Sequence, residues 1–438
     1  MDRWMKMGPG KAISLHMSCI AAALLVASAA HAVQPLEVFL AAARERNPDA
    51  QQARANLAAQ KAQALLSLGK QLPGVSVQGT YQRNQYQVDV AIPNGPTFPI
   101  QPRDEWLGSA TLTVPLIDLA SFRRISAANT NAESYARTLE ATGLAVEGQT
   151  AQDYYQLLAN VALVATAENY LDVSRESLRL TEAKLRAGTA TRLDVDRARA
   201  DVEQQVQQLA SANLQVALAA RDLESTTSIA PDLSSVVELS DDLHPEPELA
   251  VFQAKLSGVP SVSAAASATR VAQQQADAQR LALLPSIAGS ITEYNTNAPG
   301  FQPSRWYWQA GITATWSFDV TNIANIRGSD ASADAVRAQE LKARLDAGDA
   351  IHKYWNTVLA SIAQSRSARV GRDAAVHASE QARVQYRAGT STQLDLLQAQ
   401  RDAFKAEVTR IQDDANLLNA RAQLRLAAGM SLLASLNR

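Results

Sequence analysis

Two short turns carry the polar residues whose types and spacing repeat along the chain. The sequence Arg-Ala-Gly-Thr occupies 186–189 and returns at 387–390, and a Leu-Asp pair follows each copy, ending at Asp194 and Asp395. The chemistry open to such a pattern is helix capping and electrostatic attraction at the two carboxylates. The turn residues are Arg186, Ala187, Gly188, Thr189, Arg387, Ala388, Gly389 and Thr390.

Helix capping accounts for part of this pattern. The glycine of each turn can take the left-handed backbone conformation that ends a helix. Thr191 and Thr392 can then cap the next helix, and the aspartate three residues later completes a capping box. Capping does not explain why the arginine and alanine of each turn also recur, so it is an incomplete account of the turns.

Other residues that could do chemistry are scattered. Beyond residue 32 the histidines are His244, His352 and His377, the one methionine is Met430, and there is no cysteine. A soft-metal site needs Cys or Met ligands, and the sequence has neither a phosphate-binding glycine loop nor a nucleophile–base pair. It therefore predicts no metal site, no cofactor and no enzyme.

Composition argues against several other classes of protein. The 438 residues carry 41 Lys+Arg against 43 Asp+Glu, without the basic excess of a nucleic-acid binder. A hydrophobic content of 47% is too high for a disordered chain. Only 5% of residues are aromatic and alanine is abundant, which favours long, closely packed helices over compact mixed cores.

The first 32 residues predict a secretory signal peptide. Three basic residues precede an apolar run at 20–28, which is too short to span a bilayer, and Ala-His-Ala at 30–32 forms a cleavage site. Cleavage there would make Val33 the first residue of the mature chain. Lipidation at Cys19 is the alternative, and it is disfavoured because Cys19 precedes the apolar run.

The chain contains a duplicated unit. Pro48 and Pro73 are 25 residues apart, as are Pro260 and Pro285. Later landmarks repeat at an offset of 201, and the difference in length falls in a Pro/Gly-rich stretch at 92–102, which is predicted as a loop. The predicted organisation is a signal peptide at 1–32, a first repeat at 33–228, a Pro- and Asp-rich linker at 229–248 and a second repeat at 249–438.

Each unit is predicted to read helix, strand, loop, strand, long helix, tight turn and helix. No proline occurs between Pro115 and Pro231, and residues 119–186 keep leucine and valine at heptad spacing. A helix of about 67 residues is about 100 Å long at ~1.5 Å per residue. Since that exceeds an ordinary globular core, the long helices must form an elongated bundle.

Four segments alternate apolar and polar residues, at about 74–92, 104–117, 286–296 and 305–318. The alternation predicts a sheet with one apolar face, which either faces lipid or is covered by a helix. Four strands cannot close a membrane barrel and open edges are not tolerated in lipid, so chains must pool strands, and three copies would give twelve. The tryptophans that fit aromatic girdles at two membrane interfaces are Trp106, Trp306, Trp308 and Trp316.

These features resemble the TolC family of outer-membrane efflux ducts. The matching features are the duplicated unit, Asn47-Pro48, Pro73 and Pro285 ahead of the strands, and the paired turns followed by Leu-Asp. The resemblance covers residues 35–430. It implies a mainly α fold with a small β part, in which a homotrimer forms a twelve-stranded transmembrane β-barrel on a long periplasmic α-helical barrel.

The resemblance also implies the function and the partners. Such a protein is the exit duct of a tripartite efflux or type I secretion system, in the outer membrane and periplasm of a Gram-negative bacterium. It works with a periplasmic adaptor and an inner-membrane pump of RND, ABC or MFS type, and with no nucleic acid. The linker would belong to a band around the middle of the helical barrel, and the turns would be tips that the adaptor contacts.

The resemblance further implies a pore constriction at the tips. Tyr386 matches a tyrosine just before the second turn, and Asp194 and Asp395 match aspartates just after the turns. Three copies would give converging carboxylates that favour cations and raise one another's pKa. Gln398 and Ser391 depart from the family pattern, where a second aspartate and a gating arginine can stand.

A soluble periplasmic coiled-coil scaffold or adaptor is the competing interpretation. An adaptor would carry one hairpin flanked by small β domains, whereas two units here each carry a hairpin and a strand pair. A scaffold also has no reason to place three tryptophans on one strand face. The sequence therefore favours the duct.

Overall fold

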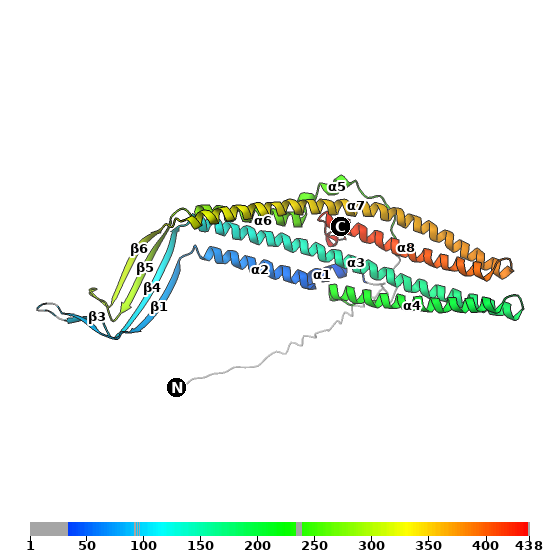
Figure 1. Ribbon diagram of the computed structural model, residues 1–438, viewed down its shortest axis with the longest axis horizontal. Coiled ribbons are helices and arrows are strands. Elements are labelled where there is room, and N and C mark those ends of the chain that lie inside the picture. The colour runs from blue at the N-terminus through cyan, green and yellow to red at the C-terminus, as the bar shows by residue number, and fades with distance from the viewer. Residues whose placement is uncertain (1–33, 92, 94, 96, 234–238, 437–438) are drawn as a thin grey trace, which may run out of the picture.

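The computed structural model describes residues 34–91, 93, 95, 97–233 and 239–436. The predicted signal peptide at 1–32 lies outside these residues, as do positions 234–238 of the predicted linker. The described chain is elongated, with a sheet at one end and helices that run from it to two turns at the other end (Figure 1). Among the described helices, none combines the length and the hydropathy needed to cross a membrane.

Four antiparallel strands form the main sheet, in the order β1-β4-β5-β6. They span Gly74–Arg83, Asp104–Ile117, Ser286–Thr296 and Trp306–Thr315. The central pairing joins the two repeats, because β4 of the first lies beside β5 of the second, with Leu112 opposite Ile291. The duplicated units therefore share one sheet, and β1 and β6 are its edges.

The first expected strand, at 74–92, is interrupted. β1 ends at Arg83, and β2 (Val88–Ala91) pairs with β3 (Thr97–Gln101) in a separate two-stranded sheet. The stretch at 92–102 that was predicted as a loop therefore contains a strand. The break occurs at Asn84, whose amide N–H and side-chain Nδ2 donate to the Arg103 and Pro102 carbonyls at 2.8 and 3.0 Å. These bonds end the β1–β4 ladder. The strands β2 and β3, which lie between Asn84 and Pro102 in the sequence, therefore pair with each other.

The last expected strand, at 305–318, is shorter than predicted, since β6 ends at Thr315. Trp316 leaves the ladder, and its indole Nε1 donates to the carbonyl oxygen of Leu283 at 3.0 Å. Asp319 then caps the following helix by accepting a hydrogen bond from the Asn322 amide at 3.0 Å. The residues after Thr315 therefore form the strand-to-helix turn.

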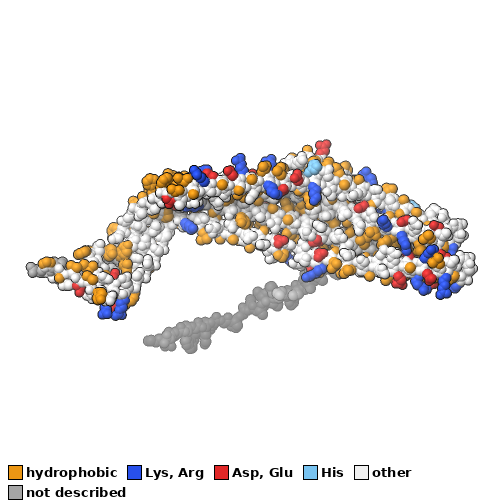
Figure 2. Space-filling view, in the orientation of Figure 1, with side chains coloured by type: hydrophobic (Ala, Val, Ile, Leu, Met, Phe, Trp, Pro, Cys, Tyr) orange, Lys and Arg blue, Asp and Glu red, His pale blue; other side chains and the backbone are white. Residues whose placement is uncertain are grey.

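The strand register gathers apolar residues on one face of the sheet. One row across the four strands runs through Val75, Leu112, Ile291 and Ala310. The other face carries hydroxyl and amide groups, such as Thr111 and Thr292, whose Oγ1 atoms are 3.0 Å apart. Hydrophobic side chains are gathered over this end of the molecule (Figure 2). Within the chain the apolar face is open, since Val77 is 81% exposed and Ile312 76% exposed.

Two helices of 68 and 69 residues dominate the rest of the molecule. They are α3 (Leu119–Arg186) and α7 (Val320–Ala388), and each turns back into a shorter helix, α4 (Arg192–Thr227) and α8 (Gln393–Ala427). Asp118 starts α3 by accepting a hydrogen bond from the Ser121 amide at 2.9 Å, in the position that Asp319 has in the second repeat. At ~1.5 Å per residue each long helix extends about 100 Å, as the proline-free sequence predicts.

Two further helices, which precede the strands of each repeat, continue the lines of α4 and α8 toward the sheet (Figure 1). α2 (Pro48–Gly69) begins where α4 ends, and the Asn47 side chain between them donates to the Thr226 carbonyl at 3.1 Å. α6 (Pro260–Leu281) follows α8 in the same way, and Gly429 lies against Pro260 there. The other helices are α1 (Leu36–Arg46), α5 (Leu249–Gln253), η1 (Leu256–Gly258) and α9 (Leu432–Leu436).

Candidate functional site at the helical tips

The two turns lie at the end of the molecule away from the sheet, and both have the predicted caps (Figure 1). Gly188 and Gly389 have φ values of 76° and 81°, in the left-handed region. In the first turn the Asp194 amide donates to Thr191 Oγ1 at 3.2 Å, while the Thr191 amide donates back to Asp194 Oδ2 at 2.9 Å. Thr392 and Asp395 repeat this capping box with bonds of 3.2 and 3.0 Å. The capping prediction is confirmed in both copies.

The two capping aspartates are held as carboxylates. The hydrogen bond from the Thr191 hydroxyl lowers the pKa of Asp194, and that from Thr392 lowers the pKa of Asp395. Asp395 is exposed at the tip and Asp194 is partly buried. Within one chain the caps thus keep negative charge at the starts of α4 and α8, where the helix N-termini also favour it.

Tyr386 holds the second tip against the first hairpin. Its side chain is only 4% exposed, and its hydroxyl lies 3.2 Å from Oγ1 of Thr181 on α3. Lys184, one turn further along α3, donates to the Tyr386 carbonyl and places Nζ 4.1 Å from the centre of the tyrosine ring. Thr181 also donates to Gln393 Oε1 on α8 at 3.1 Å. Burial raises the pKa of Tyr386, which keeps its hydroxyl protonated.

Thr181, Lys184 and Gln393 were not among the residues that the sequence singled out. A signal for them exists in the repeat, because at the offset of 201 Thr181 corresponds to Ala382 and Lys184 to Gln385. The positions where the copies differ, and not those where they agree, mark the contact between the hairpins. We call Tyr386, Thr181, Lys184 and Gln393 the tip lock.

The predicted docking residues are all on the surface. Each residue of the two Arg-Ala-Gly-Thr turns is exposed. Arg387 of the second turn makes a long ion pair, with its Nη2 3.9 Å from Oε1 of Glu176 on α3. Such residues are free to contact another molecule.

The four tryptophans of the predicted girdle are exposed on the sheet and at its border. Trp106 is 41% exposed and Trp308 72% exposed. Trp306 and Trp308 lie on the apolar face, opposite Asn295 and Glu293 of β5. Trp316 follows β6 and lies at the helix end of the sheet.

The chain matches known proteins over most of its length. The family model described as outer membrane efflux protein matches residues 39–227 and 251–430. The chain belongs to the outer membrane efflux protein family. The toluene efflux pump outer membrane protein TtgC of Pseudomonas putida is 27% identical to it over 415 residues, which cover 87% of this chain and 80% of TtgC. The resemblance to TolC-family ducts is confirmed.

Solved structures show the same fold. CusC superposes with a TM-score of 0.79 at 18% identity, covering 90% of this chain and 92% of that one. The Campylobacter jejuni CmeC outer membrane channel gives a TM-score of 0.76 at 17% identity, covering 91% and 86%. These structures agree with a mainly α fold and a small β part, and the family match makes this efflux protein an outer-membrane duct extending into the periplasm. The soluble scaffold interpretation is not favoured.

Proposed function

We propose that three copies of this efflux protein close one duct through the outer membrane and periplasm. The observation that carries the proposal is the sheet, whose apolar face is exposed and whose edges are β1 and β6. An open sheet edge is not tolerated in lipid. Pairing β1 of one copy with β6 of the next removes all edges and gives twelve strands. Trp106, Trp306, Trp308 and Trp316 then lie at the two lipid interfaces.

The duct works with a periplasmic adaptor and an inner-membrane pump of RND, ABC or MFS type. The adaptor docks at the exposed turn residues 186–189 and 387–390, which the caps hold in a fixed shape. Two relatives are named for toluene and antibiotic efflux pumps. The proposed cargo is therefore small organic compounds.

The tips form the constriction of the duct. Asp194 and Asp395 begin helices at the tip, so three copies bring six carboxylates to one ring. In such a narrow space, several carboxylates attract a cation more strongly than they would in bulk water. Tyr386, through the tip lock, fixes how far the second hairpin stands from the first, and with it the width of the ring.

The test is export by a strain whose own copy of this gene is deleted. Restoring the full-length chain should restore resistance to organic solvents or antibiotics and yield a trimer in the outer-membrane fraction, detected by chemical crosslinking. The matched control lacks residues 1–32 and should stay in the cytoplasm without restoring resistance. Recovery of the full-length chain as a soluble periplasmic monomer would overturn the proposal.

A further inference from the structure

A strap of chain lies across the second hairpin at the middle of the bundle. We define the equatorial strap as residues 239–248, which follow the first repeat and lead into α5. Leu239 is buried in the core that contains Leu157 and Ile411. At the other end, Trp355 of α7 donates its indole N–H to the Pro247 carbonyl at 3.0 Å. Between these anchors the strap is held by polar contacts.

The polar contacts converge on one buried arginine. Arg421 of α8 has a side chain that is 6% exposed. It pairs with Asp241, whose Oδ2 is 3.0 Å from its Nε, and with Glu246, whose Oε1 is 2.5 Å from its Nη1. It also donates to the carbonyl oxygen of His244 at 2.7 Å. The strap is thus wrapped around a guanidinium that belongs to the helix beneath it.

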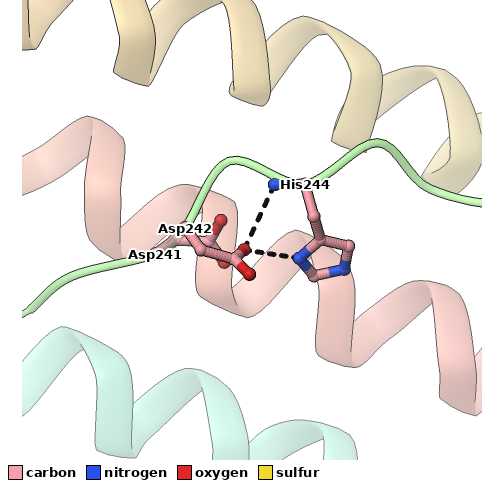
Figure 3. A group of neighbouring side chains, drawn as sticks. All are labelled: Asp241, Asp242 and His244. Carbon is pink, nitrogen blue, oxygen red and sulfur yellow. Dashed lines mark hydrogen bonds and ion pairs between the residues drawn. The ribbon is translucent and has the colours of Figure 1, made fainter.

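His244 completes this arrangement with both ring nitrogens. Nδ1 lies 2.5 Å from Asp242 Oδ1, and Nε2 lies 3.0 Å from Nη1 of Arg421. Figure 3 draws the contact between His244 and Asp242 as a dashed line. A guanidinium can only donate hydrogen bonds. Nε2 must therefore accept, which places the imidazole proton on Nδ1, facing Asp242. Both contacts can be made only by the neutral ring.

A metal ion does not fit this group. Asp241, Asp242 and His244 bring ligand atoms within 4.8 Å of one another. However, Asp241 already accepts a hydrogen bond from Arg421 Nη2 and is ion-paired with its guanidinium, and both nitrogens of His244 have partners. The guanidinium occupies the place that a cation would take.

We propose that His244 is a pH-sensitive catch that fastens the equatorial strap to α8. Histidine changes charge between about pH 5 and 8, where carboxylates and guanidinium groups ordinarily do not. A proton on Nε2 would point at the N–H of Arg421. The positively charged imidazolium and guanidinium would then repel each other at contact distance. The imidazolium then turns away from Arg421 toward solvent while it keeps its contact with Asp242, and the strap loosens as pH falls.

The charged groups near His244 determine how much the strap loosens when the ring is protonated. Asp241 and Glu246 still hold Arg421 when His244 leaves, so the strap loosens without detaching. The hydrogen bonds from His244 lower the pKa of Asp242, so that carboxylate is charged and ready to receive the imidazolium. The ring itself contacts Asp242 and Arg421. The other ionisable groups of the cluster interact with Asp241 or Glu246, and they are Arg425 of α8, Arg369 of α7 and Tyr155 of α3.

A spin label on the strap tests the catch in the membrane-embedded protein. The one cysteine of the sequence, Cys19, lies in the predicted signal peptide, so Ser240→Cys gives the exported chain one label site. The label should be immobilised at about pH 8, and its mobile fraction should rise toward about pH 5. His244→Gln can accept from Arg421 but cannot be protonated there, so it should keep the label immobile throughout. His244→Ala should give, at every pH, the raised mobile fraction that the parent chain reaches at low pH.

The matched control is His377→Gln, which changes an exposed histidine of α7 about two turns beyond Arg369, the residue that donates to the Asp241 carbonyl of the strap. That variant should retain the response of the parent chain. A response in His244→Gln equal to that of the parent would overturn the proposal. So would an immobile label in His244→Ala at about pH 8, or a parent label that does not respond to pH.

Discussion

The two tips share a backbone and differ in what holds them. Both turns place a glycine at positive φ and both start the next helix with a Thr–Asp capping box. At the position before the turn arginine, however, the first tip has Leu185, 37% exposed, and the second has Tyr386, 4% exposed. The cap is a property of the repeated unit, whereas the tip lock depends on the second copy.

This difference separates two roles within one motif. A turn whose residues are exposed in both copies suits a partner that meets six similar tips in a trimer. A buried tyrosine that joins α7 to α3 suits control of the spacing between hairpins, because movement of α7 away from α3 must break its contacts. Substitutions that act on one role and spare the other can test the separation.

The largest effect is expected from the turns themselves. Gly389→Val and Gly188→Val force a β-branched residue into the left-handed region, at a cost of about 1–2 kcal/mol each. Apart from the two adjoining residues, no atom of the described chain lies within 4 Å of the added Cβ, so the strain falls on the turn and not on packing. Both variants should assemble as trimers and lose most of their export, measured as drug susceptibility.

Gly371→Val is the matched control for these variants. Gly371 lies inside α7 with open space around it and without a positive φ. Its replacement should leave export close to that of the parent chain. If Gly389→Val exports normally, the turns are not the docking site, and the shared role assigned to the two tips fails.

The next largest effect is expected from the tip lock. Tyr386→Phe removes the hydroxyl that contacts Thr181, and a hydrogen bond of this kind contributes about 1 kcal/mol, or roughly fivefold in an equilibrium. The open state should gain accordingly, seen as longer openings in single-channel recordings. Thr181→Val should act in the same direction, since it removes the other partner of the same bond.

Leu185→Ala provides the comparison at the first tip. Leu185 occupies the position of Tyr386 one repeat earlier and makes no buried polar contact, so opening should hardly change. Equal effects at Leu185 and Tyr386 would show that side-chain volume, and not the lock, controls the spacing of the hairpins.

These contrasts also show how far the sequence predicts the site. Local signals sufficed for the caps, because Gly, Thr and Asp act within a few residues of one another. Thr181 was missed because its contact joins α3 to a residue 205 positions later. Likewise Asn84 ends the β1–β4 ladder through residues 18 and 19 positions away, which alternation cannot reveal. Register and long-range pairs arise from packing, and periodicity does not report them.

A smaller effect is expected from the charge of the second tip. Asp395→Asn keeps a side-chain oxygen that can accept the capping-box hydrogen bond from Thr392 but removes a carboxylate from the proposed ring. Block of the reconstituted channel by multivalent cations from the periplasmic side should weaken while trimer assembly stays unchanged. Asp194→Asn should weaken block less, because Asp194 is more buried than Asp395. Unchanged block in Asp395→Asn would leave Asp395 as a helix cap only.

The smallest effect is expected from acid acting on the caps. The folded pKa values of Asp194 and Asp395 lie below the ordinary value of 3.8 because of bonds from Thr191 and Thr392. A lowered pKa means that each cap contributes fully above the unfolded value and is lost as pH falls through the folded one. At neutral pH, Thr191→Ala and Thr392→Ala should therefore speed hydrogen exchange in the first turns of α4 and α8. Below the folded pKa values the parent chain should exchange as fast as the variants, after correction for intrinsic rates. Because both tips carry the same box, the two variants should respond alike, and a response confined to one tip would show that the caps differ as well.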